Sequence, residues 1–531
     1  MRWRRGVESR GRIAGQGDRL NKHPGVPRSA AAEGRAKKSG EPRGRRSVNR
    51  ALAVATRRAN AEESAEAIVP TPRGHREGPN FEGQGGVVTH FKRAMNPSGG
   101  AALGREVKGP ALGTDLMERM VATENTRRAW KQVKANRGGP GSDGMTLEAA
   151  EDWLRVHWVA TREALLAGTY QPRPLRRKAI DKRDGGKRML GIPVVIDRLI
   201  QQAMAQVLTP IFDPMFSESS FGFRPGRSAH GAIRQVQSYI GQDYRIAVDL
   251  DLAKFFDRVQ HDVLMSRVSR RVVDKRVLSL IGRYLRAGVV VDGEIQATEA
   301  GTPQGGPISP LLANILLDDL DKELERRGHH FARYADDIIV LVKTKRSAER
   351  VMASLKRYLT GVLRLPVNEE KSRVAKTDKC VFLGLTFRGT RLRWSDRAFE
   401  DFLHRLKRLT GRSWGVSMAV RLKKLAEYLR GWMGYFGVSD YYRPIPDLDS
   451  WLRRRVRMCY WKQWKRRYTR IRNLLALGAS ENTAVSTGMS RKGYWHLAKS
   501  LATQSAMTNE WLAKQGLLSI RDLWMKAHGY T

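Results

Sequence analysis

The chain has 531 residues, 41% of them apolar, so it can hold roughly three or four domains and bury at least one large core. Its 97 Lys and Arg residues outnumber its 53 Asp and Glu residues, which leaves a formal net charge of +44. This excess repels itself unless a polyanion neutralises it, so the composition favours a nucleic-acid partner over a small-metabolite substrate. Two cysteines, Cys380 and Cys459, exclude a disulfide framework and a cysteine-rich zinc site.

The N-terminal residues, 1–112, are predicted to form a basic, disordered extension. The first 60 residues carry 17 Lys or Arg against four acids and few large apolar side chains. The extension either assists nucleic-acid binding or is a dispensable leader. No apolar run approaches the roughly 20 residues that span a bilayer, and the basic N-terminus lacks a secretory signal core. We therefore expect no membrane partner and a cytoplasmic, nucleoid-associated location.

Helical and strand patterns follow from about Asp115. Apolar spacing predicts helices over 116–133, 145–166 and 197–208, the last ended by Pro210. Between the second and third, the Asp184-Gly185-Gly186 stretch predicts a turn between two strands. A helix to about residue 240, a strand over 245–252 and an amphipathic helix over 311–326 come next. Two strands, 330–334 and 338–342, flank a tight turn, and beyond about residue 387 the chain is predicted to be mainly helical.

Two acidic segments predict a divalent-cation site. Asp336 and Asp337 lie between two apolar strands, where a hairpin turn can bring both carboxylates to one edge. Asp249 and Asp251 alternate along the earlier strand and so share a face. One carboxylate from that strand and the hairpin pair can hold two Mg²⁺ ions about 3.5–4 Å apart, the arrangement that catalyses phosphoryl transfer.

Several longer segments occur in a characteristic order. They are GGKRMLGIPVVIDRLIQQA, FGFRPGRSAHGAI, VDLDLAKFFDRVQHD, GTPQGGPISPLLANILLDDLD, RYADDIIV, VNEEKS and CVFLGLTF. From about residue 115 to 445 the chain resembles a bacterial group II intron-encoded reverse transcriptase/maturase. The resemblance implies an α+β right-hand polymerase, with fingers and an antiparallel palm sheet over 113–390. An all-α thumb or maturase (X) domain over 391–478 would follow.

The resemblance assigns roles to single residues. It implies Asp251, Asp336 and Asp337 as catalytic metal ligands for two Mg²⁺ ions, since Asp251 precedes the second paired phenylalanine by five residues. Asp249 would be a structural acid. Phe256 would stack under the sugar of the incoming dNTP, or else pack in the core.

Other residues are assigned to the nucleotide and to nucleic acid. Nucleotide contacts are implied for Lys182, Lys187, Arg188 and Gln304. Arg224 would contact template or primer backbone, and Lys371 with the turn at Phe382–Gly384 resembles a region that grips the primer. Three acids after Leu311 are predicted to lie on the solvent-exposed face of their helix: Asp318, Asp319 and Asp321.

The C-terminal third distinguishes a maturase from other reverse transcriptases. RLKKLAEYLRGWMGYFGVSDYY resembles the maturase domain, with Arg430 facing nucleic acid. Residues 451–480 carry ten Lys or Arg, no acid and five interleaved aromatics, a composition that suits phosphates and unpaired bases. The predicted contacts here are Arg453, Arg454, Arg455, Trp461, Lys465, Arg466 and Arg467. Residues 479–531 resemble a short DNA-binding module, and the absence of paired cysteines predicts no HNH nuclease, hence an endonuclease-lacking type.

These patterns lead to one reading of function. The protein is predicted to copy group II intron RNA into DNA from a DNA primer at target DNA, and to bind that RNA to assist its splicing. It would act as a monomer or a homodimer. Two alternatives stay open, a splicing-only maturase with an inactive polymerase site and a retron or defence-type reverse transcriptase.

Overall fold

The computed structural model describes residues 114–181, 186–291, 294–297, 300–302 and 305–530. The predicted basic extension, 1–112, lies outside these residues. Within them, no helix is long and apolar enough to cross a bilayer.

The N-terminal described part combines helices with a four-stranded sheet of order β2-β1-β4-β5. Strands β1 (Leu175–Asp181) and β2 (Lys187–Ile192) form the predicted antiparallel hairpin, although its tip, 182–185, lies outside the described residues. The remaining elements are α2 (Leu116–Val121), α3 (Thr123–Asn136), α4 (Leu147–Leu166), α5 (Val195–Phe212), η1 (Asp213–Met215), α7 (Phe255–Arg258), α8 (His261–Val268), α9 (Lys275–Arg286), β4 (Val289–Val291) and β5 (Glu294–Gln296).

Two of the expected helix boundaries differ from the structure. The first predicted helix is divided at Ala122, whose ψ of 139° is extended, so α2 and α3 are separate. Pro210 does not end α5, which continues to Phe212. Ile211 and Phe212 are both buried there, and a proline near the end of a helix removes only one backbone hydrogen bond that packing can outweigh.

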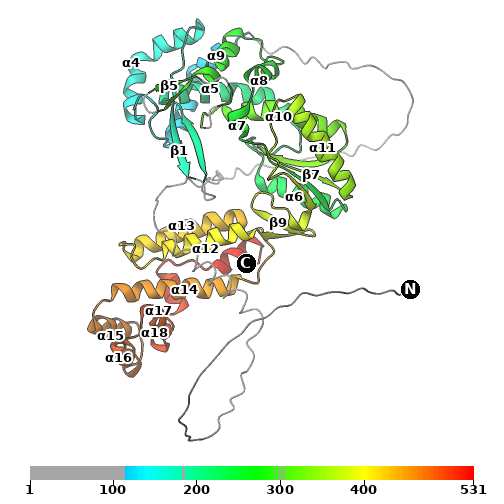
Figure 1. Ribbon diagram of the computed structural model, residues 1–531. Coiled ribbons are helices and arrows are strands. Elements are labelled where there is room, and N and C mark those ends of the chain that lie inside the picture. The colour runs from blue at the N-terminus through cyan, green and yellow to red at the C-terminus, as the bar shows by residue number, and fades with distance from the viewer. Residues whose placement is uncertain (1–113, 182–185, 292–293, 298–299, 303–304, 531) are drawn as a thin grey trace, which may run out of the picture. The chain divides into compact units, whose positions relative to one another are not determined.

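The central part is a sheet of order β6-β7-β3-β8, in which each strand pairs antiparallel with its neighbour. Figure 1 shows α10 and α11 on one face and α6 on the other. Alternate strand residues enter two different cores, Val248 and Val340 on the α11 side and Ala247 and Ile339 on the α6 side. The elements are α6 (Ala229–Gly241), β3 (Ile246–Leu250), α10 (Ser309–Arg326), β6 (His330–Tyr334), β7 (Asp337–Val342), α11 (Lys345–Gly361) and β8 (Arg373–Lys376).

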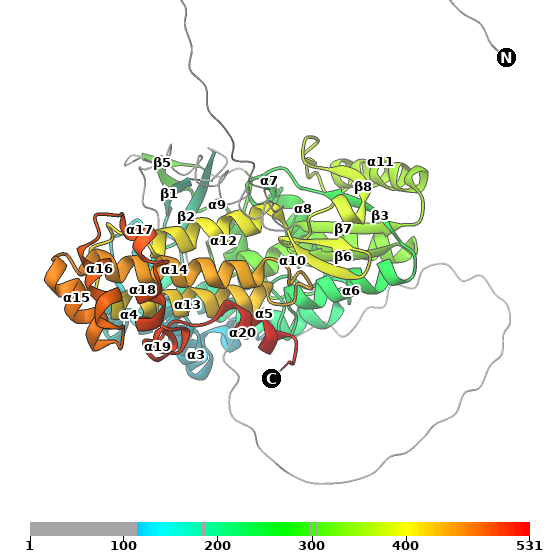
Figure 2. The same cartoon turned by 90° about the horizontal axis from the view of Figure 1, so that it is seen from below.

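A short hairpin and then helices complete the described chain. Helices α12, α13 and α14 lie side by side (Figures 1 and 2), and the rings of Phe402 and Trp432 stack at 4.0 Å between α12 and α13. The elements are η2 (Thr377–Lys379), β9 (Leu385–Arg388), β10 (Arg391–Trp394), α12 (Asp396–Leu409), α13 (Met418–Phe436), α14 (Ile445–Gln463), α15 (Arg467–Ala476), α16 (Glu481–Met489), α17 (Tyr494–Leu497), α18 (Leu501–Ala506), α19 (Asn509–Lys514) and α20 (Ile520–Ala527).

The last helices share their apolar core with α13 and α14. Asp449 near the start of α14 accepts hydrogen bonds from the Ile520 backbone at 2.8 Å and the Ser519 hydroxyl at 3.0 Å, which fixes the start of α20. Trp524 donates to the Ser439 carbonyl at 2.8 Å. The predicted fold class, an α+β part with an antiparallel sheet followed by a helical part, is confirmed.

Candidate active site

The two acidic segments meet at one end of the central sheet. The register pairs Leu250 with Ile338, so one further step places Asp251 opposite Asp337. Tyr334 pairs with Asp337 across the predicted tight turn, whose first residue, Ala335, has a φ of 59°. Asp249 and Asp337 lie on the same sheet face because side chains alternate.

The carboxylates crowd one another, which is the condition a divalent cation relieves. Asp337 is accessible to solvent on one side. Its partial burial, and next the negative charges of Asp336, Asp251 and Asp249, raise the pKa of Asp337 to about 6. A hard cation with oxygen ligands would remove this repulsion. The residues present therefore fit a magnesium site.

The site is open rather than enclosed. Within the described ranges, no three His, Cys, Asp or Glu side chains come together as a group that could by itself hold a metal ion. Mg²⁺ normally keeps several waters and is shared with substrate phosphates, so a few carboxylates at an exposed strand end suffice.

Asp249 and Asp251 have different partners. Asp249 forms an ion pair with Arg373 of β8 at 3.4 Å. Asp251 is held through its backbone: its N–H donates to the Ser372 hydroxyl oxygen at 3.0 Å, and its carbonyl accepts from the Asn368 N–H at 2.9 Å. Lys371 Nζ lies 4.0 Å from the Asp251 carboxylate, so this lysine is beside the proposed metal ligands.

A buried network behind the hairpin holds it in place. Arg333 and Asp321 are both fully buried, and Arg333 Nε lies 2.8 and 3.0 Å from the two Asp321 oxygens. Arg333 Nη1 also donates to the Ala335 carbonyl at 3.0 Å and to Asn314 Oδ1 at 2.9 Å. Asn314 in turn donates to the Gly222 carbonyl at 2.8 Å. The strained residue of the turn is thereby tied to α10.

Gly222 closes the back of the hairpin. A Cβ at this position would lie 2.2 Å from the Ala335 nitrogen, a distance no side chain can occupy. The first glycine of the FGFRPGRS loop therefore allows this loop to pack directly against the backbone of the acidic turn. The sequence alone did not assign this role.

The expectation for the three acids of α10 is wrong. Asp321 has no exposed surface. Asp319 forms ion pairs with Arg267 at 2.9 Å and with Arg270 at 2.6 Å. Burial raises the pKa of Asp318 to about 6. These side chains face neighbouring elements because helix α10 is covered on more than one side.

The expected nucleic-acid contact of Arg224 also requires correction. Its guanidinium is buried and ion-paired with Asp213 at 2.8 Å. It also donates to the Ser217 and Ser220 carbonyls at 2.6 and 2.9 Å. Because all three guanidinium nitrogens donate hydrogen bonds within the protein, Arg224 stabilises its own loop and is not available to bind a phosphate.

The predicted nucleotide contacts are described in part. Phe256 is half-buried in α7, its ring edge-on to the buried Phe255 with centroids 5.1 Å apart. Its carbonyl accepts from the Thr302 N–H at 2.7 Å, so Thr302 lies beside Phe256. Lys187 is exposed at the start of β2. Lys182 and Gln304, together with the side chain of Arg188, lie outside the described residues.

The basic and aromatic segment is split between core and surface. Trp461 is fully buried and donates to Thr503 Oγ1 at 3.0 Å, so the expectation that it stacks on bases is wrong. Arg455 packs over the Trp451 ring at 5.1 Å, and burial lowers its pKa to about 10. Arg453 pairs with Asp449 at 2.7 Å, and Arg454 lies 3.8 Å over the Trp495 ring. The Arg453 ion pair and the Arg455–Trp451 contact lie within α14. Arg454 and Arg455 also hold α14 to neighbouring elements, since Arg454 donates to the Trp495 carbonyl and Arg455 to the Thr410 hydroxyl.

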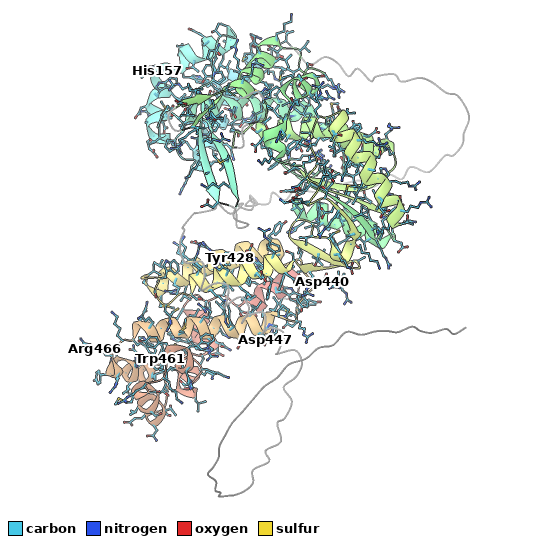
Figure 3. The ribbon with its side chains drawn as sticks, in the orientation of Figure 1. His157, Tyr428, Asp440, Asp447, Trp461 and Arg466 are labelled. Atoms are coloured by element: carbon cyan, nitrogen blue, oxygen red, sulfur yellow. The ribbon has the colours of Figure 1, made fainter. Side chains whose placement is uncertain are left out.

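An exposed basic surface remains where α14 passes into α15. Lys465, Arg466 and Arg467 are exposed, and Tyr468 beside them is 76% exposed. Figure 3 shows Trp461 among the helices and Arg466 at the outer end of the same helical part. Arg430 on α13 is exposed as well. We call residues 465–468 the α14–α15 basic surface.

Comparison with known proteins identifies the family. Residues 180–387 match the reverse transcriptase (RNA-dependent DNA polymerase) family, and residues 399–476 match the group II intron maturase-specific domain. Protein YkfC of Escherichia coli K12 is 36% identical over 284 residues, which cover 46% of this chain and 74% of that protein. The chain belongs to the reverse transcriptase family and carries a group II intron maturase domain.

Two further similarities cover smaller shares. Group II intron-encoded protein LtrA of Lactococcus lactis is 29% identical over 326 residues, 49% of this chain and 54% of that protein. A chain of the solved Cas6-RT-Cas1–Cas2 complex is 25% identical, with 46% of this chain and 42% of that chain covered and a TM-score of 0.31. The match thus spans about three quarters of YkfC and about half of LtrA.

Proposed function

We propose that this chain is an active RNA-directed DNA polymerase that copies group II intron RNA from a DNA primer. The observation that carries the proposal is the meeting of Asp251 and Asp337 at the open end of an apolar sheet, next to Asp336. The repulsion between these carboxylates is relieved when a cation is shared between them. The match of the surrounding residues to reverse transcriptases supports the same reaction.

The residues divide the work as follows. Asp251, Asp336 and Asp337 hold two Mg²⁺ ions, which activate the primer hydroxyl and neutralise the departing pyrophosphate when bound. Lys187 and Arg188, with Lys182 and Gln304, orient the dNTP. Phe256 lies beneath its sugar. Arginine suits the triphosphate because its planar fork meets two phosphate oxygens at once.

We further propose that the helical part binds the intron RNA and assists its splicing. The α14–α15 basic surface offers three cations and an exposed aromatic ring, the combination that binds phosphates and stacks on unpaired bases. The maturase-specific match over 399–476 includes the whole of this surface. The intron RNA supplies the splicing chemistry, and the protein contributes binding energy.

The remaining expectations belong to the same proposal. Fingers and palm occupy 113–390, the maturase domain 391–478 and a DNA-binding module 479–531. The protein works in the cytoplasm at the nucleoid, as a monomer or a homodimer.

Primer extension on a long RNA template with Mg²⁺ and dNTPs tests the polymerase proposal. Asp251→Asn should lower the rate by about 100-fold or more, since it removes a charge placed where the transition state needs it. Asp249→Asn is the matched control on the same strand face, and we expect it to keep most of the activity because Arg373 occupies its carboxylate. Equal losses in both variants, or no cDNA from the wild type, would contradict the assignment.

A further inference from the structure

A strained turn lies at Phe382–Leu385, just before β9. Its ends exchange backbone hydrogen bonds, Phe382 N to Leu385 O at 2.9 Å and Leu385 N to Phe382 O at 3.0 Å. Both central residues have positive φ, 51° at Leu383 and 78° at Gly384. This two-residue hairpin geometry suits glycine and asparagine, whereas leucine adopts it only with backbone strain. Such strain persists only where neighbouring groups fix the backbone.

The end of the maturase helix α13 supplies those groups. The Tyr435 hydroxyl donates to the Leu383 carbonyl at 3.0 Å. The Phe436 ring lies against Gly384, where an added Cβ would come within 3.2 Å of it. The Phe436 carbonyl is itself held by the Trp394 indole N–H at 2.9 Å. The turn is therefore clamped from α13.

Tyr435 is also fixed to the central sheet layer. Its carbonyl lies 2.8 Å from His230 Nε2 of α6, and the two rings stack with centroids 5.4 Å apart. Burial, and then the nearby Tyr334 and Asp337, raise the pKa of Tyr435 to about 12. The tyrosine thus contacts the strained turn while lying close enough to the acidic hairpin to sense its charge.

We propose that Tyr435 is a positioning residue of the polymerase centre, which holds the Leu383 turn at a fixed place relative to Asp336 and Asp337. The inference rests on the proposed polymerase function. Val381, the residue just before the turn, is 44% exposed and offers an apolar contact for the 3′ end of the primer. A maturase-domain side chain would in this way set the alignment of the primer for DNA synthesis.

This role predicts an effect on rate and not on affinity. The Tyr435 hydroxyl donates its hydrogen bond to the Leu383 backbone carbonyl, so removing the hydroxyl removes no contact to nucleic acid. A displacement of about 1 Å in the reacting atoms can cost about 100-fold in rate. We therefore expect Tyr435→Phe to slow addition of one nucleotide by about 10- to 100-fold, with the dissociation constant of the primer–template unchanged.

Single-turnover addition of one dNTP to a bound primer–template, with binding measured separately, tests the inference. Tyr358→Phe is the matched control, because it removes a tyrosine hydroxyl that donates to a backbone carbonyl, Asp319 O at 3.1 Å, elsewhere in the central part. We expect the control to extend primers at the wild-type rate. The double variant Tyr435→Phe/Leu383→Asn should recover most of the lost rate, since Asn-Gly adopts this turn without strain.

Each outcome decides a separate point. A wild-type rate in Tyr435→Phe, an equal loss in the control, or weaker primer binding would overturn the positioning role. Failure of Leu383→Asn to restore the rate would show that Tyr435 does not act through the turn, and would overturn it too. If the wild type itself extends no primer, the proposed polymerase function fails and this inference fails with it.

Discussion

The buried pair behind the acidic hairpin gives the sharpest stability prediction. Asp321→Asn replaces a carboxylate that accepts two hydrogen bonds from Arg333 Nε, at 2.8 and 3.0 Å, and a further one from Nη2. Both side chains are fully buried, so the guanidinium would keep its charge with no counter-charge and no water. Breaking a buried pair by removing one partner costs about 3–5 kcal/mol, and we expect a loss of that size in the free energy of unfolding.

A second variant separates stability from positioning. Asp321→Leu/Arg333→Met replaces both charges by apolar groups, a change that is often neutral for stability. It also removes the donor to the Ala335 carbonyl, so cDNA synthesis should fall although the fold is kept. Urea denaturation followed by circular dichroism, together with primer extension, measures both effects. A loss below about 1 kcal/mol in Asp321→Asn would refute the reasoning, because a fully buried, unpaired guanidinium cannot cost so little.

Three further predictions concern the metal site and the helical part. Since the pKa of Asp337 is raised to about 6, Mg²⁺ must displace a proton at low pH, so its apparent affinity in primer extension should weaken as pH falls from 7 to 5.5 and hold steady above 7. Trp461→Ala should destabilise the helical part by about 3–5 kcal/mol in urea denaturation, whereas Tyr468→Ala should leave stability unchanged and weaken RNA binding. Replacing Lys465, Arg466 and Arg467 by glutamine should reduce the slope of log affinity against log salt by about 2 to 3, and an unchanged slope would move the RNA-binding surface elsewhere.

Local patterns were sufficient to predict the acidic hairpin and the strand opposite it. Two short apolar runs on either side of a tight turn define two strands, and this geometry does not depend on distant parts of the chain. The facing of Asp251 and Asp337 depends on the register between β3 and β7. No pattern within either strand encodes that register, so only the structure reveals it.

The roles of Asp321 and Arg224 could not be read from the sequence because each depends on a distant partner. Consecutive acids on a helix are typical of a solvated face, yet α10 is covered on several sides and Asp321 meets Arg333 of β6. One signal was available: Arg333 interrupts an apolar strand, and a charge buried in a sheet requires a counter-charge. Arg224 lies in a loop rich in glycine and proline, where composition does not indicate which backbone carbonyls a guanidinium will meet.

The helical part shows why composition overestimates a binding surface. Residues 451–480 have a uniform basic and aromatic character, but helix α14 has two faces and its aromatic residues mostly occupy the buried one. The arginines around Trp451 and Trp495 pack on those rings, because long side chains can bury their stems and planes while remaining charged. Of the seven predicted contacts in this segment, Lys465, Arg466 and Arg467 at the α14–α15 junction are the ones whose exposure fits the expected binding of nucleic acid.

The most direct test of the account compares two activities in one variant. Asp336→Ala/Asp337→Ala is assayed for cDNA synthesis on an RNA template and for splicing of the flanking intron RNA at low Mg²⁺, beside the wild type. We predict that the wild type performs both, and that the variant makes no cDNA and still promotes splicing, since RNA binding lies on other residues. A wild type that promotes splicing and makes no cDNA, or a variant that retains cDNA synthesis, would contradict the assignment of Asp336 and Asp337 as the polymerase centre.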